Sequence, residues 1–250
     1  ATTTFALADI SVSGGTIDNF ASTTSSVYTA TFTPSSDGAC TIDVAADTFT
    51  DAYGNNNSAA DQFTWTYDGT SPTMTIASTT SGVTDGSTTN DETIALTFTS
   101  SESTTTFAVG DVTVSGGSLS NFAGSGTDYT ATFTPTADST TNGVISVASS
   151  KFSDAAGNTN NDGSDANNSV TLSVDTVSPT IAISSDVSSL KAGETATLSF
   201  TLSESSTNFE ADDLTVSGGS LSNFSGSGPS YSATFTPTAD STTDGAISIA

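Results

Sequence analysis

Carboxylates are the only abundant charged groups with which this chain could do chemistry. Its 250 residues include 27 Asp and Glu, two Lys, no Arg and no His. Without histidine, the Ser-His-Asp and Cys-His catalytic arrangements and the usual zinc sites are excluded. A pair of carboxylates could hydrolyse a glycoside, but no motif places such a pair in a cleft lined with aromatic residues. We therefore expect no enzymatic activity.

Carboxylates are also ligands for hard cations, and here the sequence is more informative. A net charge of −25 repels itself unless cations screen or bind it. Calcium takes six to eight oxygen ligands, which acidic loops can supply. The same charge makes nucleic acid and anionic membranes poor partners. No stretch approaches the ~18 apolar residues that a membrane helix needs, so we expect no membrane insertion.

The elements that must position these carboxylates belong to an internal repeat. The segments DISVSGGTIDNF, DVTVSGGSLSNF and DLTVSGGSLSNF begin at Asp9, Asp111 and Asp213, each 102 residues after the one before. A period of this length is too long for one turn of a solenoid and matches a self-contained sandwich domain.

Within each repeat the apolar residues alternate, as expected for strands half buried against a second sheet. In the central repeat this pattern predicts seven short strands, near residues 74–76, 94–98, 112–114, 119–122, 129–133, 145–147 and 170–174. Gly-rich and Asn-Gly turns separate them. The predicted fold is all-β: tandem immunoglobulin-like, Greek-key β-sandwich repeats of seven strands.

The phase of the repeat predicts the domain boundaries. If each repeat begins near the Ser-Pro pairs at Ser71 and Ser178, then residues 70–176 form a complete repeat. Residues 1–69 then lack the first strands of a repeat, and residues 177–250 lack the last strand. We expect the chain to be a window cut from a longer array. The alternative is that the incomplete terminal repeats complement each other by donated strands.

The central run TTTFAVGDVTVSGGSLSNFAGSGTDYTATFTP, followed by KFSDAAGN and closed by DTVSPT, resembles the bacterial Ig-like repeats of large surface adhesins and biofilm proteins. The resemblance covers the whole chain. It implies a stalk module that holds a binding tip away from the cell, and in several adhesin families calcium stiffens the junctions between such modules. The same module also occurs in phage fibres and other filaments.

Strand direction predicts which loops meet at the junctions between repeats. Acidic and amide side chains from the linkers, from the strand ends and from the loop after the sixth strand should gather there as calcium ligands. The candidates at the first junction are Asp68, Glu102, Asp111, Asp154 and Asn158, and those at the second are Asp175, Glu204 and Asp213. The competing interpretation is that Asp154 and Asn158 only shape a turn. The segment NTNNDG at 158–163 echoes half of a calcium loop, but Ser169 stands where the loop needs a bidentate Glu.

These observations leave three functions open. The first is an extracellular stalk or adhesin array that extends and stiffens, with calcium between neighbouring repeats of the chain. The second is a subunit of a filament or fibre, assembled with other copies through sheet edges or donated strands. The third is a module whose loops bind a glycan or a host protein. All three place the protein outside the cell, secreted or displayed on a surface.

Overall fold

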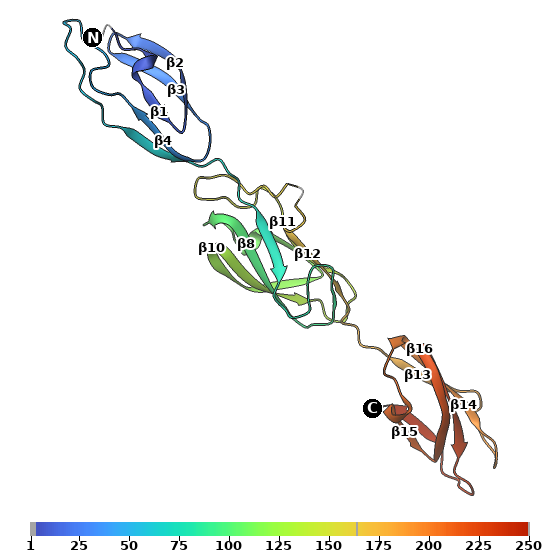
Figure 1. The fold of residues 1–250 in the computed structure, drawn as a ribbon. Coiled ribbons are helices and arrows are strands. Elements are labelled where there is room, and N and C mark those ends of the chain that lie inside the picture. The colour runs from blue at the N-terminus through green and yellow to red at the C-terminus, as the bar shows by residue number, and fades with distance from the viewer. Residues whose placement is uncertain (1–3, 164, 250) are drawn as a thin grey trace. The chain divides into compact units, whose positions relative to one another are not determined.

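The computed structural model describes residues 4–163 and 165–249 and is built from β-strands, turns and three short 3-10 helices. Its contacts divide the chain into two compact units, unit 1 at Ala1–Thr176 and unit 2 at Val177–Ala250. Unit 1 holds the first repeat and the central repeat, and unit 2 holds the third (Figure 1).

The first repeat contains two small antiparallel sheets. Strands β1, β4 and β5 form one sheet, in that order, and β2 pairs with β3 in the other. The elements are η1 (Leu7–Asp9), β1 (Ser11–Ser13), β2 (Gly15–Thr24), β3 (Val27–Pro34), β4 (Gly38–Asp43) and β5 (Phe63–Tyr67).

The central repeat forms a sandwich of two sheets. One sheet has the order β10-β8-β6 and the other has the order β7-β12-β11-β9, in which β7 and β12 run parallel. The elements are β6 (Met74–Ser78), β7 (Thr88–Thr89), β8 (Ile94–Thr104), η2 (Val109–Asp111), β9 (Val112–Ser115), β10 (Gly117–Pro135), β11 (Gly143–Val147) and β12 (Ser169–Val174).

Unit 2 repeats most of this plan. Strands β13, β14 and β16 form one sheet, and β15 pairs with β17. The elements are β13 (Ile181–Ser185), β14 (Ala196–Ser206), η3 (Ala211–Asp213), β15 (Leu214–Ser217), β16 (Gly219–Pro237) and β17 (Ala246–Ile249).

The predicted all-β sandwich fold is confirmed, and the predicted strands of the central repeat are found with two differences. The short strand β7 (Thr88–Thr89) is not among the predicted ones, and two predicted strands share one element. The segments at 119–122 and 129–133 belong to the single element β10, which folds back on itself. Close backbone approach explains the glycines in this element. A Cβ at Gly117 would lie 2.4 Å from the Thr134 carbonyl oxygen, and one at Gly124 would lie 2.3 Å from that of Asp128.

An aromatic cluster recurs in all three repeats around one phenylalanine. Phe107 contacts Tyr129 edge to face, with ring centroids 5.0 Å apart, and also packs on Phe122 and Phe152. Phe5 and Phe209 occupy the same position in the first and third repeats, each 5.0 Å from the ring of its own tyrosine. Since aromatic side chains bury large apolar areas, this cluster anchors the 3-10 turn to each sandwich.

The first repeat differs from the other two in how one core position is filled. Cys40 of β4 is fully buried and pairs with Trp65, whose ring lies 4.8 Å from that of Phe32. In the central repeat the position of Cys40 is taken by Gly143, which pairs with Leu172. A Cβ at Gly143 would lie 2.7 Å from the Phe133 ring, so this ring leaves no room for a side chain at that position.

Removing the central aromatic ring should destabilise the central repeat strongly. Phe107 is 5% exposed, so Phe107→Ala should lower the free energy of unfolding by about 3–5 kcal/mol through lost burial and a cavity. Val109→Ala, at a side chain 51% exposed, is the control and should change it by less than about 0.5 kcal/mol. Urea unfolding, followed through NMR signals of the central repeat, measures the free energy of unfolding of both variants. An equal loss of stability in the two variants would contradict the placement of Phe107 in the core.

Candidate metal centre

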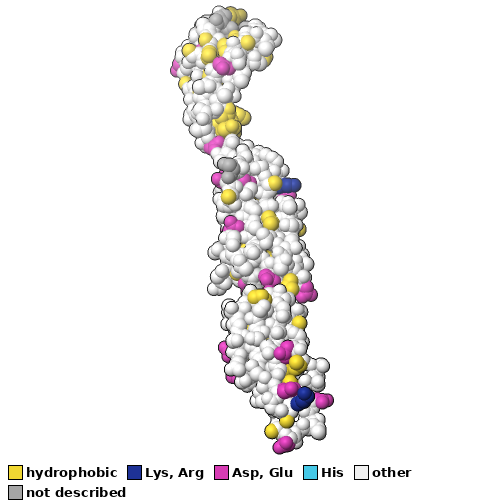
Figure 2. Space-filling view, turned by 90° about the vertical axis from the view of Figure 1, so that its right-hand side faces the viewer, with side chains coloured by type: hydrophobic (Ala, Val, Ile, Leu, Met, Phe, Trp, Pro, Cys, Tyr) yellow, Lys and Arg dark blue, Asp and Glu magenta, His cyan; other side chains and the backbone are white. Residues whose placement is uncertain are grey.

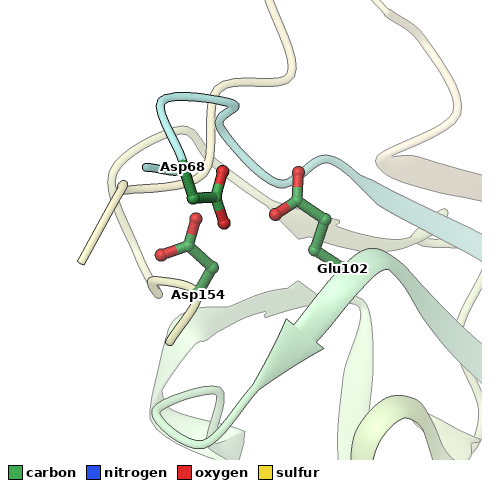
Figure 3. Close-up of side chains that lie close together, drawn as sticks. All are labelled: Asp68, Glu102 and Asp154. Carbon is green, nitrogen blue, oxygen red and sulfur yellow. The ribbon is translucent and has the colours of Figure 1, made fainter. Parts of the chain in front are cut away.

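Three carboxylates converge in unit 1 from three separate segments. Asp68 lies in the linker after β5, Glu102 lies on β8, and Asp154 lies in the loop after β11. One ligand oxygen from each lies within 4.8 Å of those of the other two. Figure 3 shows the three carboxylates turned toward a common space. The structure thus brings together three of the four acidic residues predicted at the first junction, and the fifth predicted residue, Asn158, hydrogen-bonds to two of them.

The loop after β11 holds Asp154 in a tight turn. Its Oδ1 accepts the backbone N–H groups of Gly157 and Asn158 at 2.7 and 2.8 Å, and its Oδ2 accepts the Asn158 side-chain amide at 2.9 Å. Burial raises the pKa of Asp154, but these hydrogen bonds outweigh it and hold the pKa below its usual value. The carboxylate is therefore ionised at neutral pH.

The same turn occurs in the first repeat. Asp51 accepts hydrogen bonds from Tyr53 and from both the backbone and the side chain of Asn55. The turn is therefore a general feature of the repeat. What distinguishes the central repeat is the approach of Asp68 and Glu102 to it.

The linker is hydrogen-bonded to the loops around it. The Asn158 side-chain amide also donates to the backbone carbonyl of Asp68, at 3.1 Å. Asp37, in the turn before β4, accepts the Gly69 N–H at 2.7 Å and the Thr70 hydroxyl. The Thr70 and Gly69 bonds lower the pKa of Asp37.

Burial and neighbouring negative charges make it unfavourable for Glu102 to ionise in the folded protein. Burial raises its pKa above the usual 4.5, and the charges of Asp68, Asp154 and Asp37 raise it further. A cation bound among the carboxylates would offset the repulsion between their negative charges. Three oxygen ligands with uncompensated negative charge suit a hard divalent cation.

The remaining acidic residues predicted as ligands lie outside the cluster of Asp68, Glu102 and Asp154. Asp111 and Asp213 accept the backbone N–H of the residue before a 3-10 turn, Ala108 and Glu210 respectively, each at 2.8 Å. Glu204 and Asp213 line a hollow in unit 2, whereas Asp175 belongs to unit 1. A metal-binding role for Asp111, Asp175, Glu204 and Asp213 remains a prediction.

Sequence reasoning missed two features of this region. Asp37 approaches the linker only through the fold, and no spacing in the sequence signals it. Asn160 and Asp162, in the Asn-rich loop, are almost fully buried, at 0% and 3% exposed. A polar pair buried in this way has a structural role, because buried polar groups must be hydrogen-bonded.

The chain can now be compared with known proteins. A family model described as the bacterial Ig-like domain matches residues 1–67, 68–173 and 175–250. The chain belongs to the bacterial Ig-like domain family. Bacterial Ig-like domains are generally non-enzymatic structural modules and are typically extracellular or surface-associated. A search of curated proteins finds none that matches the chain.

The surface of these Ig-like domains is acidic. Figure 2 shows Asp and Glu side chains spread over the face in view, with few basic ones among them. Among the described residues, no helix has the length and apolar character needed to cross a membrane.

Neutralising Glu102 should stabilise the central Ig-like domain when no cation is present. Because the folded state raises the pKa of Glu102, it binds the proton more tightly than the unfolded state, and stability falls as the pH rises above about 4.5. With a chelator present, Glu102→Gln should therefore unfold at higher urea concentration than the native protein at pH 7. The two should converge below pH 4.5, and a difference independent of pH would contradict the electrostatic origin.

Proposed function

We propose that the chain is part of an extracellular stalk whose linkers stiffen when they bind calcium. The observation that supports this function best is the cluster of Asp68, Glu102 and Asp154. It joins a linker residue to two elements of the central domain, so an ion bound there would fix the linker.

Calcium suits the cluster better than the softer metals. The three side chains offer only carboxylate oxygens, and the described residues provide no histidine or cysteine within the cluster. Calcium accepts flexible geometry and six to eight oxygens, so backbone carbonyls and water would complete its shell. One divalent ion would offset most of the local negative charge that raises the pKa of Glu102.

Stiffening follows from where the ligands lie. Asp68 is two residues before Thr70, and both are already tied to neighbouring loops by hydrogen bonds. Adding metal bonds to this segment would restrict the linker further, and the charge of the whole chain favours an extended arrangement once the linker is fixed.

Calcium should raise the thermal stability of the central domain, because only the folded state assembles the ligands. At a concentration about a hundredfold above Kd, binding contributes about 2.7 kcal/mol to the free energy of unfolding. Calorimetry with calcium and with a chelator measures this shift. Asp68→Asn and Glu102→Gln should each abolish most of it.

Asp128→Asn is the matched control, because it removes one exposed acidic charge from the same domain outside the cluster. It should leave the calcium shift unchanged. Equal melting temperatures with calcium and chelator, together with no heat of binding, would reject the calcium site. Small-angle scattering in both conditions tests the stiffening itself, which should appear as a narrower distribution of interatomic distances.

A further inference from the structure

The entry segment of the central domain, residues 68–76, is hydrogen-bonded along both of its edges. On one edge β6 pairs with β8 in an antiparallel ladder. On the other edge, the described residues form no strand but the Asn-rich loop of residues 158–163 and 165–167, which we call the strap. The strap leads directly into β12, the last strand of the domain.

Five hydrogen bonds join the strap to the entry segment. Asn161 N–H donates to the Pro72 carbonyl at 2.9 Å, and Ile76 N–H donates to that of Asn167 at 2.7 Å. Asp162 Oδ1 accepts the Met74 N–H at 2.5 Å. Side-chain amides make the other two bonds, from Asn158 to the Asp68 carbonyl and from Asn167 to the Thr75 hydroxyl.

The order of these bonds shows how the strap runs relative to the entry segment. Going from residue 68 to residue 76, the partners on the strap rise from 158 to 167, so the two segments run parallel. The bonds use alternate residues of the entry segment, 72, 74 and 76, while Thr73 and the β6 ladder face β8. The strap therefore supplies the pairing that a parallel strand would supply.

The strap is itself fastened to the body of the domain. The Asn160 side chain accepts the N–H groups of Lys151 and Phe152 and donates to the Ala148 carbonyl at 3.0 Å. It also donates to Asp162 Oδ2 at 2.7 Å. Asp162 thus connects the entry segment on one oxygen to the anchored Asn160 on the other. In the first domain Asn57 makes the corresponding bonds to Thr48, Phe49 and Ala45.

We propose that the strap is a force-bearing clamp, a mechanical function in addition to the stiffening. The proposal rests on the proposed function only in that a stalk is pulled at its two ends. A pull along the chain draws the entry segment toward its N-terminus and the strap toward its C-terminus. Because the segments are parallel, this load acts along their length and strains all the bonds together. An antiparallel edge loaded at one end would instead open one bond at a time.

A second parallel contact supports the same end of the chain. Strand β7 pairs in parallel with β12 through Thr88–Thr89 and Ser173–Val174, and Asp175 N–H donates to the Thr89 carbonyl at 3.2 Å. The exit strand is therefore held by a parallel neighbour as well. Both contacts must slide before the two ends of the domain can separate.

Single-molecule force spectroscopy of residues 1–250 tests the clamp, with a chelator present so that calcium does not contribute. The central domain is recognised by the chain length that it releases, about 3.5 Å for each unfolded residue. Forced unfolding reports the unfolding rate, which is the quantity that a clamp changes.

Asp162→Ala is the decisive variant because it removes the buried link between Met74 and Asn160. Its unfolding rate under load should rise about tenfold, equivalent to about 1.4 kcal/mol of barrier. Val147→Ala, at a fully buried side chain of β11 outside the strap, is the matched control. Urea unfolding of both variants measures how much free energy of unfolding each loses. The change in unfolding rate under load is then compared per unit of free energy lost.

The outcomes separate the clamp from the calcium site. The clamp is supported if Asp162→Ala weakens the domain under load more than Val147→Ala does at equal loss of stability. It is overturned if the two variants behave alike. Neither result depends on calcium, whereas the calcium site fails only if calcium binds with no effect or does not bind.

Discussion

A buried strand must satisfy the hydrogen-bonding groups on both of its edges, and this constraint organises the central domain. Strand β6 lies at the edge of its sheet, so β8 satisfies only one side. The loop after β11 satisfies the other side, and the buried carboxylate of Asp162 takes the Met74 N–H that no carbonyl reaches. Leaving that donor unpaired would cost on the order of 1–3 kcal/mol. The shape of the loop follows from this requirement.

The candidate metal centre depends on the same loop. Asp154 and Asn158 stand at its start, where the turn around Asp154 directs one carboxylate toward Asp68 and Glu102. Asn158 then reaches the linker carbonyl at Asp68. One loop, residues 154–163 and 165–167, therefore both contributes to the proposed calcium site and pairs with the free edge of the entry strand. A change in this loop would affect the electrostatics of the linker and the packing of the domain together.

The sequence predicted the fold well because its signal is periodic. Alternating apolar residues marked the strands, and the 102-residue recurrence marked the domains, since both features reflect burial at regular intervals. Asp68, Glu102 and Asp154 could be grouped because strand direction places their segments at one end of the sandwich. The roles of Asp37, Asn160 and Asp162 could not be predicted in this way. Their partners are backbone groups that become neighbours only after the loops have folded, and the segment NTNNDG suggested a calcium loop where the structure has a buried polar link.

The exchange of Cys40 for Gly143 has a consequence for biosynthesis. Neighbouring domains with the same fold and related sequences, emerging one after another from a ribosome, can trade strands and become trapped in misassembled pairs. If β4 entered the central sandwich in place of β11, the side chain of Cys40 would meet the Phe133 ring, where even a Cβ lies only 2.7 Å away. The reverse exchange would leave a void beside Trp65. Such differences in core volume between adjacent copies would disfavour an exchange of strands between domains.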